Sequence, residues 1–262
     1  MSHDPLSFCV MSVNLGKRHA TLLSLLSTSS ADCILVQEPL WTISPPLCSD
    51  SDPAGVPRYQ ALRHPAWSCL FPPPPYFALN HGPHVMIYWR SSLPFSFTLA
   101  SGSQLYFLMS VNILAPGFFL CVFNFYHHVP CRGHGLRQLL DLDIPSDVPC
   151  LIAGDFNSHS RVWSLPHTPA SPWAQDLESW FLEQDLTLLN PLHSPTWWNA
   201  AETQSSTIDL MAVNSAELSR WAIQVSCDVS FPEAGDSDHA ALSLLIPLAS
   251  VPEYSPVPPV TG

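Results

Sequence analysis

Charged residues are scarce in this sequence, and basic residues are the scarcest. Asp, Glu, Lys and Arg make up 11% of the 262 residues, with 9 Lys and Arg against 21 Asp and Glu. The formal net charge of −12 argues against an extended basic surface for nucleic acid, because Lys and Arg contacts to phosphates supply most of the non-specific affinity. A polyanion bound by this chain is therefore expected to be held locally, with the help of a divalent cation.

Cysteine pairs of the kind that bind zinc are absent from the sequence. The eight cysteines include no C-x-x-C spacing, and several, such as Cys33 in ADCILV and Cys121 in FFLCVF, lie inside apolar runs. This pattern is typical of free, buried thiols in a reducing compartment rather than of a disulfide framework.

Long hydrophobic runs are absent as well. No stretch approaches the roughly 18 uninterrupted apolar residues of a membrane span. The start, MSHDPLSFCVMSVN, carries Asp4 and Pro5 and lacks the basic region and long apolar run of a signal peptide. We therefore expect an intracellular protein that is not secreted and has no membrane partner.

Apolar residues make up 47% of the chain and occur mainly in short runs. Eight runs bounded by Gly, Pro, Asn or Ser are typical of strands: residues 8–14, 33–39, 84–90, 105–112, 118–126, 150–157, 206–214 and 240–247. Three segments predict helices: 17–28, 135–143 and 171–184, the last with Ser171 as its cap and Pro172 in its first turn. This layout predicts sheets that are covered by helices on one face and packed on another sheet on the other face.

The 28 prolines concentrate in loops and near the C-terminal end. We interpret residues 8–249 as one domain, preceded by an N-terminal extension, 1–7, and followed by a Pro-rich tail, 250–262. The PPPP at 72–75 is typical of a stiff surface loop, and binding to an SH3-like groove is the alternative.

Polar residues able to do chemistry recur at the ends of the apolar runs. They are Asn14, Gln37, Glu38, Asn124, Tyr126, Asp155 and Asn157, together with Asp209, Asp238 and His239 in the last two runs. Each alone is weak support for a function, because such residues also cap and turn strands. Together they supply the carboxylates, amides, tyrosine and histidine that suit hydrolysis of a phosphodiester with a hard metal.

The residue types suggest a division of labour. Glu38 and Asp238 offer the oxygen ligands that Mg²⁺ or Mn²⁺ prefers, with Asn14 as a neutral partner. Asp155 can orient or deprotonate the attacking water while Asn157 fixes the phosphate. His239 can donate to the phosphate or assist a proton transfer if a carboxylate holds its ring, and Asp209 is the natural candidate.

The motifs GDFNSH, STIDL and SDHAAL, in this order and preceded by VQEP and NFYHH, resemble those of the endonuclease/exonuclease/phosphatase superfamily. Within it, NLGKRHATLLSLL, GDFNSHSRVW and SPTWWNAAETQSSTIDL are most similar to the apurinic-type endonuclease domain of non-LTR (LINE-like) retrotransposons. The resemblance implies a DNase I-like fold: a four-layered α/β sandwich of two packed, mainly antiparallel β-sheets flanked by helices.

The resemblance also implies a role for each of the polar residues. The metal site would hold Mg²⁺ (or Mn²⁺) with Glu38, Asn14 and Asp238, the last also serving the proton network. The catalytic set would be Asp155 (activating water), Asn157 (binding phosphate), Tyr126 (contacting the scissile phosphate) and Asp209, paired with the catalytic His239. The implied activity is a DNA endonuclease that leaves a 3′-hydroxyl and a 5′-phosphate. We expect a monomer, located in the nucleus if the chain derives from a retroelement.

Two features depart from the pattern of that family. Gly16 stands where many apurinic endonucleases carry an acid, and the chain is acidic, with Arg58, Arg63, Arg132 and Arg137 as candidates for a local basic patch. Two other functions therefore stay open: a phosphatase or phosphodiesterase acting on a small or lipid phosphoester, and a silent retroelement remnant acting as an interaction module. The joint presence of all the polar motif residues argues against a silent remnant.

Several residues beside the motifs have two interpretations. His127, His128, His159 and Trp163 flank motif positions and can touch the substrate, whereas packing within a loop is at least as good an interpretation. Trp197 and Trp198 can stack on a base, but a core or loop-anchoring role is favoured.

Overall fold

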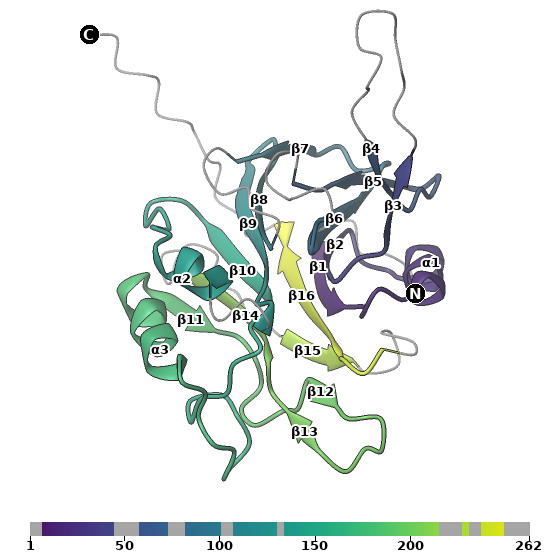
Figure 1. Ribbon diagram of the computed structural model, residues 1–262. Helices are drawn as coiled ribbons and strands as arrows, with labels where there is room; N and C mark the ends of the chain where they lie inside the picture. Colours follow the sequence, from purple (N-terminus) through teal and green to yellow (C-terminus); the bar gives the residue numbers. More distant parts are fainter. Residues whose placement is uncertain are drawn as a thin grey trace, which may run out of the picture.

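Two β-sheets packed face to face form the centre of the protein (Figure 1). The computed structural model describes residues 7–44, 58–72, 82–100, 107–129, 134–214, 227–230 and 237–248. The Pro-rich tail and most of the PPPP segment lie outside the described residues.

The first sheet has the strand order β15-β16-β1-β2-β6-β5. Its strands are β1 (Ser7–Asn14), β2 (Cys33–Gln37), β5 (Trp67–Leu70), β6 (Val85–Arg90), β15 (Cys227–Ser230) and β16 (Ala241–Pro247). Only β1 and β2 run parallel among these neighbours, and every other neighbouring pair is antiparallel.

The second sheet has the order β11-β14-β10-β9-β8-β7. Its strands are β7 (Ser96–Leu99), β8 (Leu108–Ala115), β9 (Phe118–Tyr126), β10 (Cys150–Asp155), β11 (Leu186–Leu188) and β14 (Asp209–Asn214). Here β9 and β10 form the parallel pair. Two small sheets pair β3 (Trp41–Ser44) with β4 (Arg58–Ala61) and β12 (Trp197–Trp198) with β13 (Ser205–Ser206).

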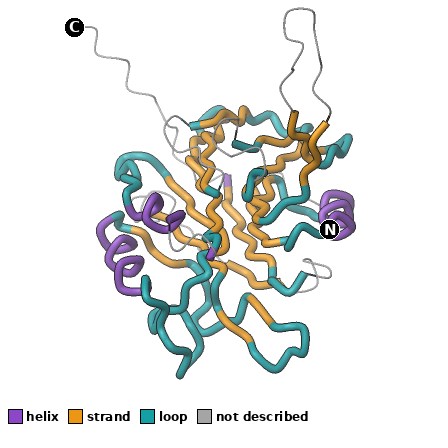
Figure 2. Tube along the Cα trace, in the orientation of Figure 1, coloured by secondary structure: helices purple, strands orange, loops and turns teal. Residues whose placement is uncertain are grey.

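Helices cover the outer face of each sheet, so the sandwich has four layers. Helix α1 (His19–Thr28) packs on the first sheet, and α2 (His134–Leu140) and α3 (Ala174–Glu183) pack on the second, as Figure 2 also shows. One apolar cluster fills the space between the sheets, and two others lie between a sheet and its helices. The expected four-layered, mainly antiparallel α/β fold is confirmed.

The alternation of side chains along each strand decides which layer a residue enters. In β1, Phe8 and Val10 face the other sheet, whereas Met11 and Val13 face α1. In β9 the even-numbered residues face inward, and in β10 the odd-numbered residues do. Tyr126 and Asp155, the last residues of these strands, therefore lie on the inner face.

Glycine at position 154 permits β9 and β10 to approach closely. Gly154 has φ of 152°, and a Cβ atom built there would lie 1.8 Å from the backbone oxygen of Phe125. No residue with a side chain fits without separating the two strands. The glycine that precedes Asp155 thus sets the packing of the parallel pair.

Several sequence-based element boundaries differ from the structure: the expected strand 105–112 is β8 at Leu108–Ala115, the expected helix 135–143 ends at Leu140, and two further elements differ more. Helix α3 begins at Ala174, after Trp173, and not directly after Ser171, because the hydroxyl of Ser171 accepts the amide of His159 (2.8 Å) and does not cap the helix. The expected strand 206–214 is split: Ser206 pairs with β12, and β14 begins at Asp209.

Three further expectations concern membrane-spanning helices, the state of the cysteines and the candidate basic patch. None of the helices in the described ranges has the length and hydrophobicity needed to cross a lipid bilayer. Cys9, Cys33, Cys69, Cys121 and Cys150 are free. Two members of the candidate basic patch lie apart, because the guanidinium of Arg137 lies over the ring of Trp173 while Arg63 lines a cavity beside β5. Arg132 lies outside the described residues.

Candidate functional site

The carboxyl ends of both parallel strand pairs meet at one edge of the sandwich, which we call the site edge. Asn14 ends β1, beside Gln37 at the end of β2, and Asp155 ends β10, beside Tyr126 at the end of β9. Asp209 is the first residue of the antiparallel strand β14 and lies directly opposite Asp155. The fold therefore brings together polar residues that are far apart in sequence.

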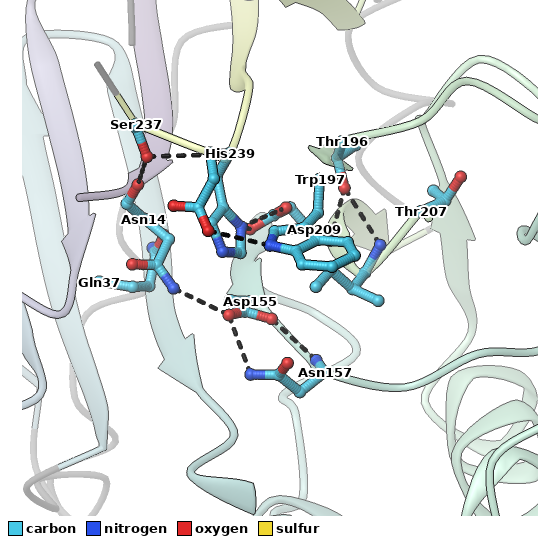
Figure 3. A network of polar contacts seen from close by, with 12 residues as sticks. Asn14, Gln37, Asp155, Asn157, Thr196, Trp197, Thr207, Asp209, Ser237 and His239 are labelled. Carbon is cyan, nitrogen blue, oxygen red and sulfur yellow. Dashed lines mark hydrogen bonds and ion pairs between the residues drawn. The ribbon is translucent and has the colours of Figure 1, made fainter. Parts of the chain in front are cut away.

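Asp155 is the centre of a hydrogen-bond network that joins the two sheets (Figure 3). Its Oδ2 accepts Nδ2 of Asn14 at 2.8 Å and Nδ2 of Asn157 at 2.9 Å. Its Oδ1 accepts the backbone amide of Asn157, also at 2.9 Å. The side chain is buried, and these donors fix the plane of the carboxylate.

Two residues of the site edge have left-handed backbones. Asn157 has φ of 45° and Glu38 has φ of 47°. Asparagine tolerates this conformation, but for glutamate it costs free energy, on the order of 1–3 kcal/mol. The amide of Glu38 donates to the carbonyl of His84 (2.9 Å), and its carbonyl accepts the amide of Lys17 (2.8 Å). These contacts hold Glu38, which is half-buried, at the end of β2 beside the Asn14 loop.

His239 and Asp209 form a buried pair. Nδ1 of His239 lies 3.0 Å from Oδ2 and 3.2 Å from Oδ1 of Asp209. Since a carboxylate accepts, Nδ1 carries a proton in this contact. Two loop hydroxyls support the pair: Oγ1 of Thr196 accepts the amide of Asp209 (3.0 Å), and Oγ of Ser237 accepts the amide of His239 (3.1 Å).

Asp238 lies next to this pair and is held from two sides. Its Oδ1 accepts Arg18 at 3.2 Å, and its Oδ2 accepts Nε1 of Trp197 at 3.1 Å. Its side chain is 40% exposed. Both of its carboxylate oxygens therefore contact protein donors, and the indole of Trp197 fastens the residue before His239 to strand β12.

The buried charges change two pKa values. Burial, and next the negative charge of Asp209, raise the pKa of Asp155 to about 7. Burial lowers the pKa of His239, but the charge of Asp209 and the hydrogen bond to it outweigh this and raise the pKa to about 9. At neutral pH the imidazole is therefore protonated, and Asp155 is poised between its two forms.

Tyr126 belongs to a group of rings beside the site. It is buried and stacks on His84 with ring centroids 5.3 Å apart, and His128 lies 4.8 Å from His84. His127 points elsewhere, because its Nδ1 contacts the carbonyl of Phe156 at 3.0 Å. The indole of Trp163 is also buried and donates to the carbonyl of Ser158 at 3.0 Å, so Trp163 anchors its loop.

The expected site residues do not all lie in one cluster. Within the described residues, Asp155, Asp209 and His239 form a group whose candidate ligand atoms lie within 4.8 Å of one another. The expected metal ligands Glu38 and Asp238 lie outside this group, although both are at the site edge.

Gln37 and Asn124, also noted at strand ends, lie between the sheets below the site. Nε2 of Gln37 donates to Oδ1 of Asn124 at 2.6 Å, and Asn124 donates to the carbonyls of Val36 and Met86. Both residues are completely buried. They bridge the sheets and do not face a substrate.

Sequence reasoning missed four residues that support the site: Arg18, Thr196, Trp197 as a partner of Asp238, and Ser237. Their contacts join loops that are distant in sequence, for example Arg18 and Asp238, 220 positions apart. The motif SPTWW, which lies shortly before STIDL in the sequence, could have indicated that Thr196 and Trp197 lie near the site.

The site fits a divalent cation. Two carboxylates, Asp155 and Asp209, lie directly opposite each other on neighbouring strands, an arrangement that is unfavourable without a compensating positive charge. His239 compensates one of them, and burial together with the charge of Asp209 raises the pKa of Asp155. With Glu38 and the amide of Asn14 nearby, the donors are hard oxygens, the type that Mg²⁺ and Mn²⁺ prefer.

Comparisons with known proteins agree with the fold and the motifs. Residues 120–243 match the family model described as endonuclease-reverse transcriptase. The endonuclease domain of TRAS1, a telomere-specific non-LTR retrotransposon, is 14% identical, with a TM-score of 0.61 over 92% of this chain and 99% of that domain. The AP endonuclease LMAP from Leishmania major is 15% identical, with a TM-score of 0.63 over 94% of this chain and 89% of that one.

A 3′-5′ exonuclease, NExo, from Neisseria meningitidis is 14% identical, with a TM-score of 0.55 over 90% of this chain and 98% of that enzyme. The search of curated proteins gives no match. At these identities the solved structures show a shared fold. Together with the family match, they confirm the likeness to the superfamily that the motifs indicated.

Proposed function

We propose that this chain, which has the fold and the motifs of the endonuclease/exonuclease/phosphatase superfamily, is a divalent-metal-dependent phosphodiesterase that nicks DNA. One observation carries the proposal: Asp155, held by Asn14 and Asn157, faces the paired Asp209 and His239 within 4.8 Å. This arrangement offers a base for water and a cation for phosphate in one buried place.

Asp155 is the group that accepts a proton from the attacking water. Three donors fix its carboxylate, and its pKa of about 7 suits a base at neutral pH. The water oxygen bonds to phosphorus, and the P–O3′ bond breaks. The leaving oxygen takes up a proton from solvent water and becomes a 3′-hydroxyl, the phosphate stays on the 5′ side, and Asp155 returns its proton to solvent.

His239 is the cation of the site. Because Asp209 accepts its Nδ1 proton, the ring is oriented and Nε2 remains to donate to a phosphoryl oxygen. Asn157 and Tyr126 are the other groups we assign to the phosphate. Asp238, whose oxygens accept Arg18 and Trp197, orients the loop of His239 in this proposal.

The metal would be Mg²⁺ or Mn²⁺, held by Glu38 and Asn14, with Asp238 as the further candidate ligand. When bound, it polarises the phosphoryl oxygen and stabilises the charge that develops on the phosphate.

The retrotransposon type of endonuclease is the branch we favour. The TRAS1 domain, described as part of a non-LTR retrotransposon, spans nearly the same length of chain, and the matched family model is described as endonuclease-reverse transcriptase. We propose accordingly that residues 8–249 form the catalytic domain, that it acts as a monomer on DNA, and that it works in the nucleus.

Nicking of supercoiled plasmid tests this function. Purified protein is incubated with Mg²⁺, with Mn²⁺ and with EDTA, beside the variants Asp155→Ala and His239→Ala. We expect metal-dependent nicking by the wild type, loss of nicking in both variants, and nicks that a polymerase can extend directly because they carry a 3′-hydroxyl.

A folded wild type that does not nick the plasmid contradicts the proposal. Hydrolysis of a small phosphoester in that case would favour the phosphatase alternative, for which the net charge of −12 is better suited than for DNA. Inactivity on both substrates would favour a silent remnant.

A further inference from the structure

A cavity of about 510 Å³ opens between two loops that both start at the site edge. The first loop follows Asn157 and includes Arg161, Ser164 and His167. The second includes His193 and leads to Thr196, whose hydroxyl accepts the amide of Asp209. Nδ1 of His193 contacts the carbonyl of Ser164 at 2.7 Å and so fastens the loops together. The cavity therefore lies between the loop that follows Asn157 and the loop that leads to Thr196, the residue that contacts Asp209.

The lining of the cavity carries positive charge and no carboxylate. Arg161 supplies this charge, and the imidazoles of His167 and His193 line the same cavity with Ser164 and Thr168. Because a carbonyl accepts, Nδ1 of His193 is a donor, and its Nε2 is not used in that contact. Glu178, whose carboxylate accepts the hydroxyl of Ser160, is not among the lining residues.

Arg161 differs from the other arginines whose side chains the structure describes. Arg18 binds Asp238, Arg90 binds backbone carbonyls, and Arg137 lies over the ring of Trp173. Arg161 is exposed and has no ion pair or hydrogen bond within the described ranges. Arg63 also lacks such a partner there, but its cavity includes Pro65 and Trp67, at the end of β5 that lies farthest from the site edge.

We propose that the cavity around Arg161 is a subsite for a backbone phosphate of the DNA strand, next to the scissile phosphate in the active site. The guanidinium of Arg161 offers the fork of N–H donors that matches phosphate oxygens, and the side chains of His167, His193 and Thr168 form polar walls around it. Val162 and Leu192, beside the lining residues, are exposed apolar side chains that a sugar can contact. The subsite rests on the proposed nuclease function and gives an acidic chain a local grip on its polyanion.

The test compares Arg161→Gln with Arg63→Gln, a matched exposed arginine at the other end of the sandwich. Binding of a labelled short DNA duplex is followed by fluorescence anisotropy in EDTA over a range of salt concentrations. For Arg161→Gln we expect roughly tenfold weaker binding near 0.1 M salt, with the slope of log affinity against log salt reduced by about 1. Arg63→Gln should leave both unchanged.

Kinetics separate the subsite from the chemistry. On a DNA duplex, Arg161→Gln should raise KM and leave kcat unchanged, and hydrolysis of bis(p-nitrophenyl) phosphate, which is too small to reach the cavity, should be unchanged. His193→Gln should show a weaker effect in the same direction.

Equal affinity and equal salt slope in Arg161→Gln and the wild type overturn the subsite, and so does a wild type that does not bind DNA. A wild type that binds DNA but hydrolyses neither substrate contradicts the proposed function alone, because the anisotropy comparison still decides whether Arg161 holds phosphate.

Discussion

Asn14 donates from Nδ2 to Oδ2 of Asp155 over 2.8 Å, a contact between the two sheets and between residues 141 positions apart. The backbone of Asn14 is itself held, since its carbonyl accepts the hydroxyl of Ser237 at 2.7 Å and its Oδ1 accepts the amide of Gly16 at 2.9 Å. One asparagine therefore links β1, the loop before β16 and the carboxylate on β10. The orientation of the proposed base depends on this link.

Replacement of Asn14 tests how far the orientation of Asp155 matters. Asn14→Ala removes the donor, and we expect plasmid nicking to fall on the order of 10- to 100-fold, the usual range for a group that orients an active-site ligand. Asn14→Asp should be at least as damaging, because it places a like charge against Asp155. Full activity in either variant would show that the contact between the sheets is not needed for catalysis.

The pKa of Asp155 predicts how the metal-free protein responds to pH. Its folded pKa is about 7, against an ordinary value of 3.8, so between about pH 4 and pH 7 the folded protein binds a proton that the unfolded chain has released. This contribution to stability is therefore lost as the pH rises through 7. We expect the Tm of the wild type in EDTA to fall across this window relative to the Tm of Asp155→Asn.

His239 gives a second pH range in which the stability of the folded protein falls as the pH rises. Its folded pKa is about 9, above the ordinary 6.5, so its stabilising effect is complete below about pH 6.5 and is lost as the pH rises through 9.

Added Mg²⁺ should raise the Tm most at pH 8, where Asp155 is ionised and can compensate the charge of the cation. Parallel Tm curves for the wild type and Asp155→Asn in EDTA, together with no effect of Mg²⁺, would contradict this account.

Loss of the carboxylate that holds His239 should damage chemistry more than stability. Asp209→Asn keeps the shape of the side chain but removes the negative charge and replaces one of its two acceptor oxygens by an amide donor. We expect kcat to fall on the order of 10²- to 10⁴-fold, the range for a positioned acid–base group.

Asp32→Asn is a matched control for this prediction. Asp32 is also a buried carboxylate, but it accepts the amide of Cys9 at 2.8 Å and directly precedes β2, at the end of the strand away from the site edge. Its kcat should be close to that of the wild type. Equal losses in the two variants would indicate that both act through folding.

The sequence was sufficient to predict the long central strands, because their apolar runs are bounded by turn residues, but not short strands such as β3, β7 and β11. Tyr126 and Asp155 were chosen as candidates because they end such runs, and the fold places the two side by side. The same pattern could not distinguish Gln37 and Asn124, which share the inner face but bond to each other below the site. Thr196 and Ser237 carry no signal of their own, since a hydroxyl acquires its role only when the fold brings a distant amide to it.

Gln37 and Asn124 should contribute to stability as a pair. Asn124→Leu removes the 2.6 Å acceptor of Nε2 of Gln37 and leaves that donor only the longer contacts to the hydroxyl of Ser12 (3.2 Å) and the carbonyl of Leu35 (3.4 Å), at a cost of about 1 kcal/mol or more. The double variant Gln37→Leu/Asn124→Leu should lose less than the sum of the single variants, because neither buried amide is then left behind. Urea denaturation of the four proteins measures the coupling, and strict additivity would show that the two amides do not stabilise each other.

Gly154→Ala should be strongly destabilising, because the new Cβ would meet the backbone of Phe125 at 1.8 Å and force β9 and β10 apart. Gly117→Ala is the control: Gly117 also has positive φ, 73°, but open space around its Cβ position, so only backbone strain of about 1–2 kcal/mol is expected. Denaturant titration should give a larger loss for Gly154→Ala. Nicking by the folded fraction should also fall, since separation of these strands moves Asp155 away from Tyr126. Similar losses of stability in the two variants would mean that the parallel pair can relax around a side chain at position 154, and the placement of Asp155 would then not require glycine.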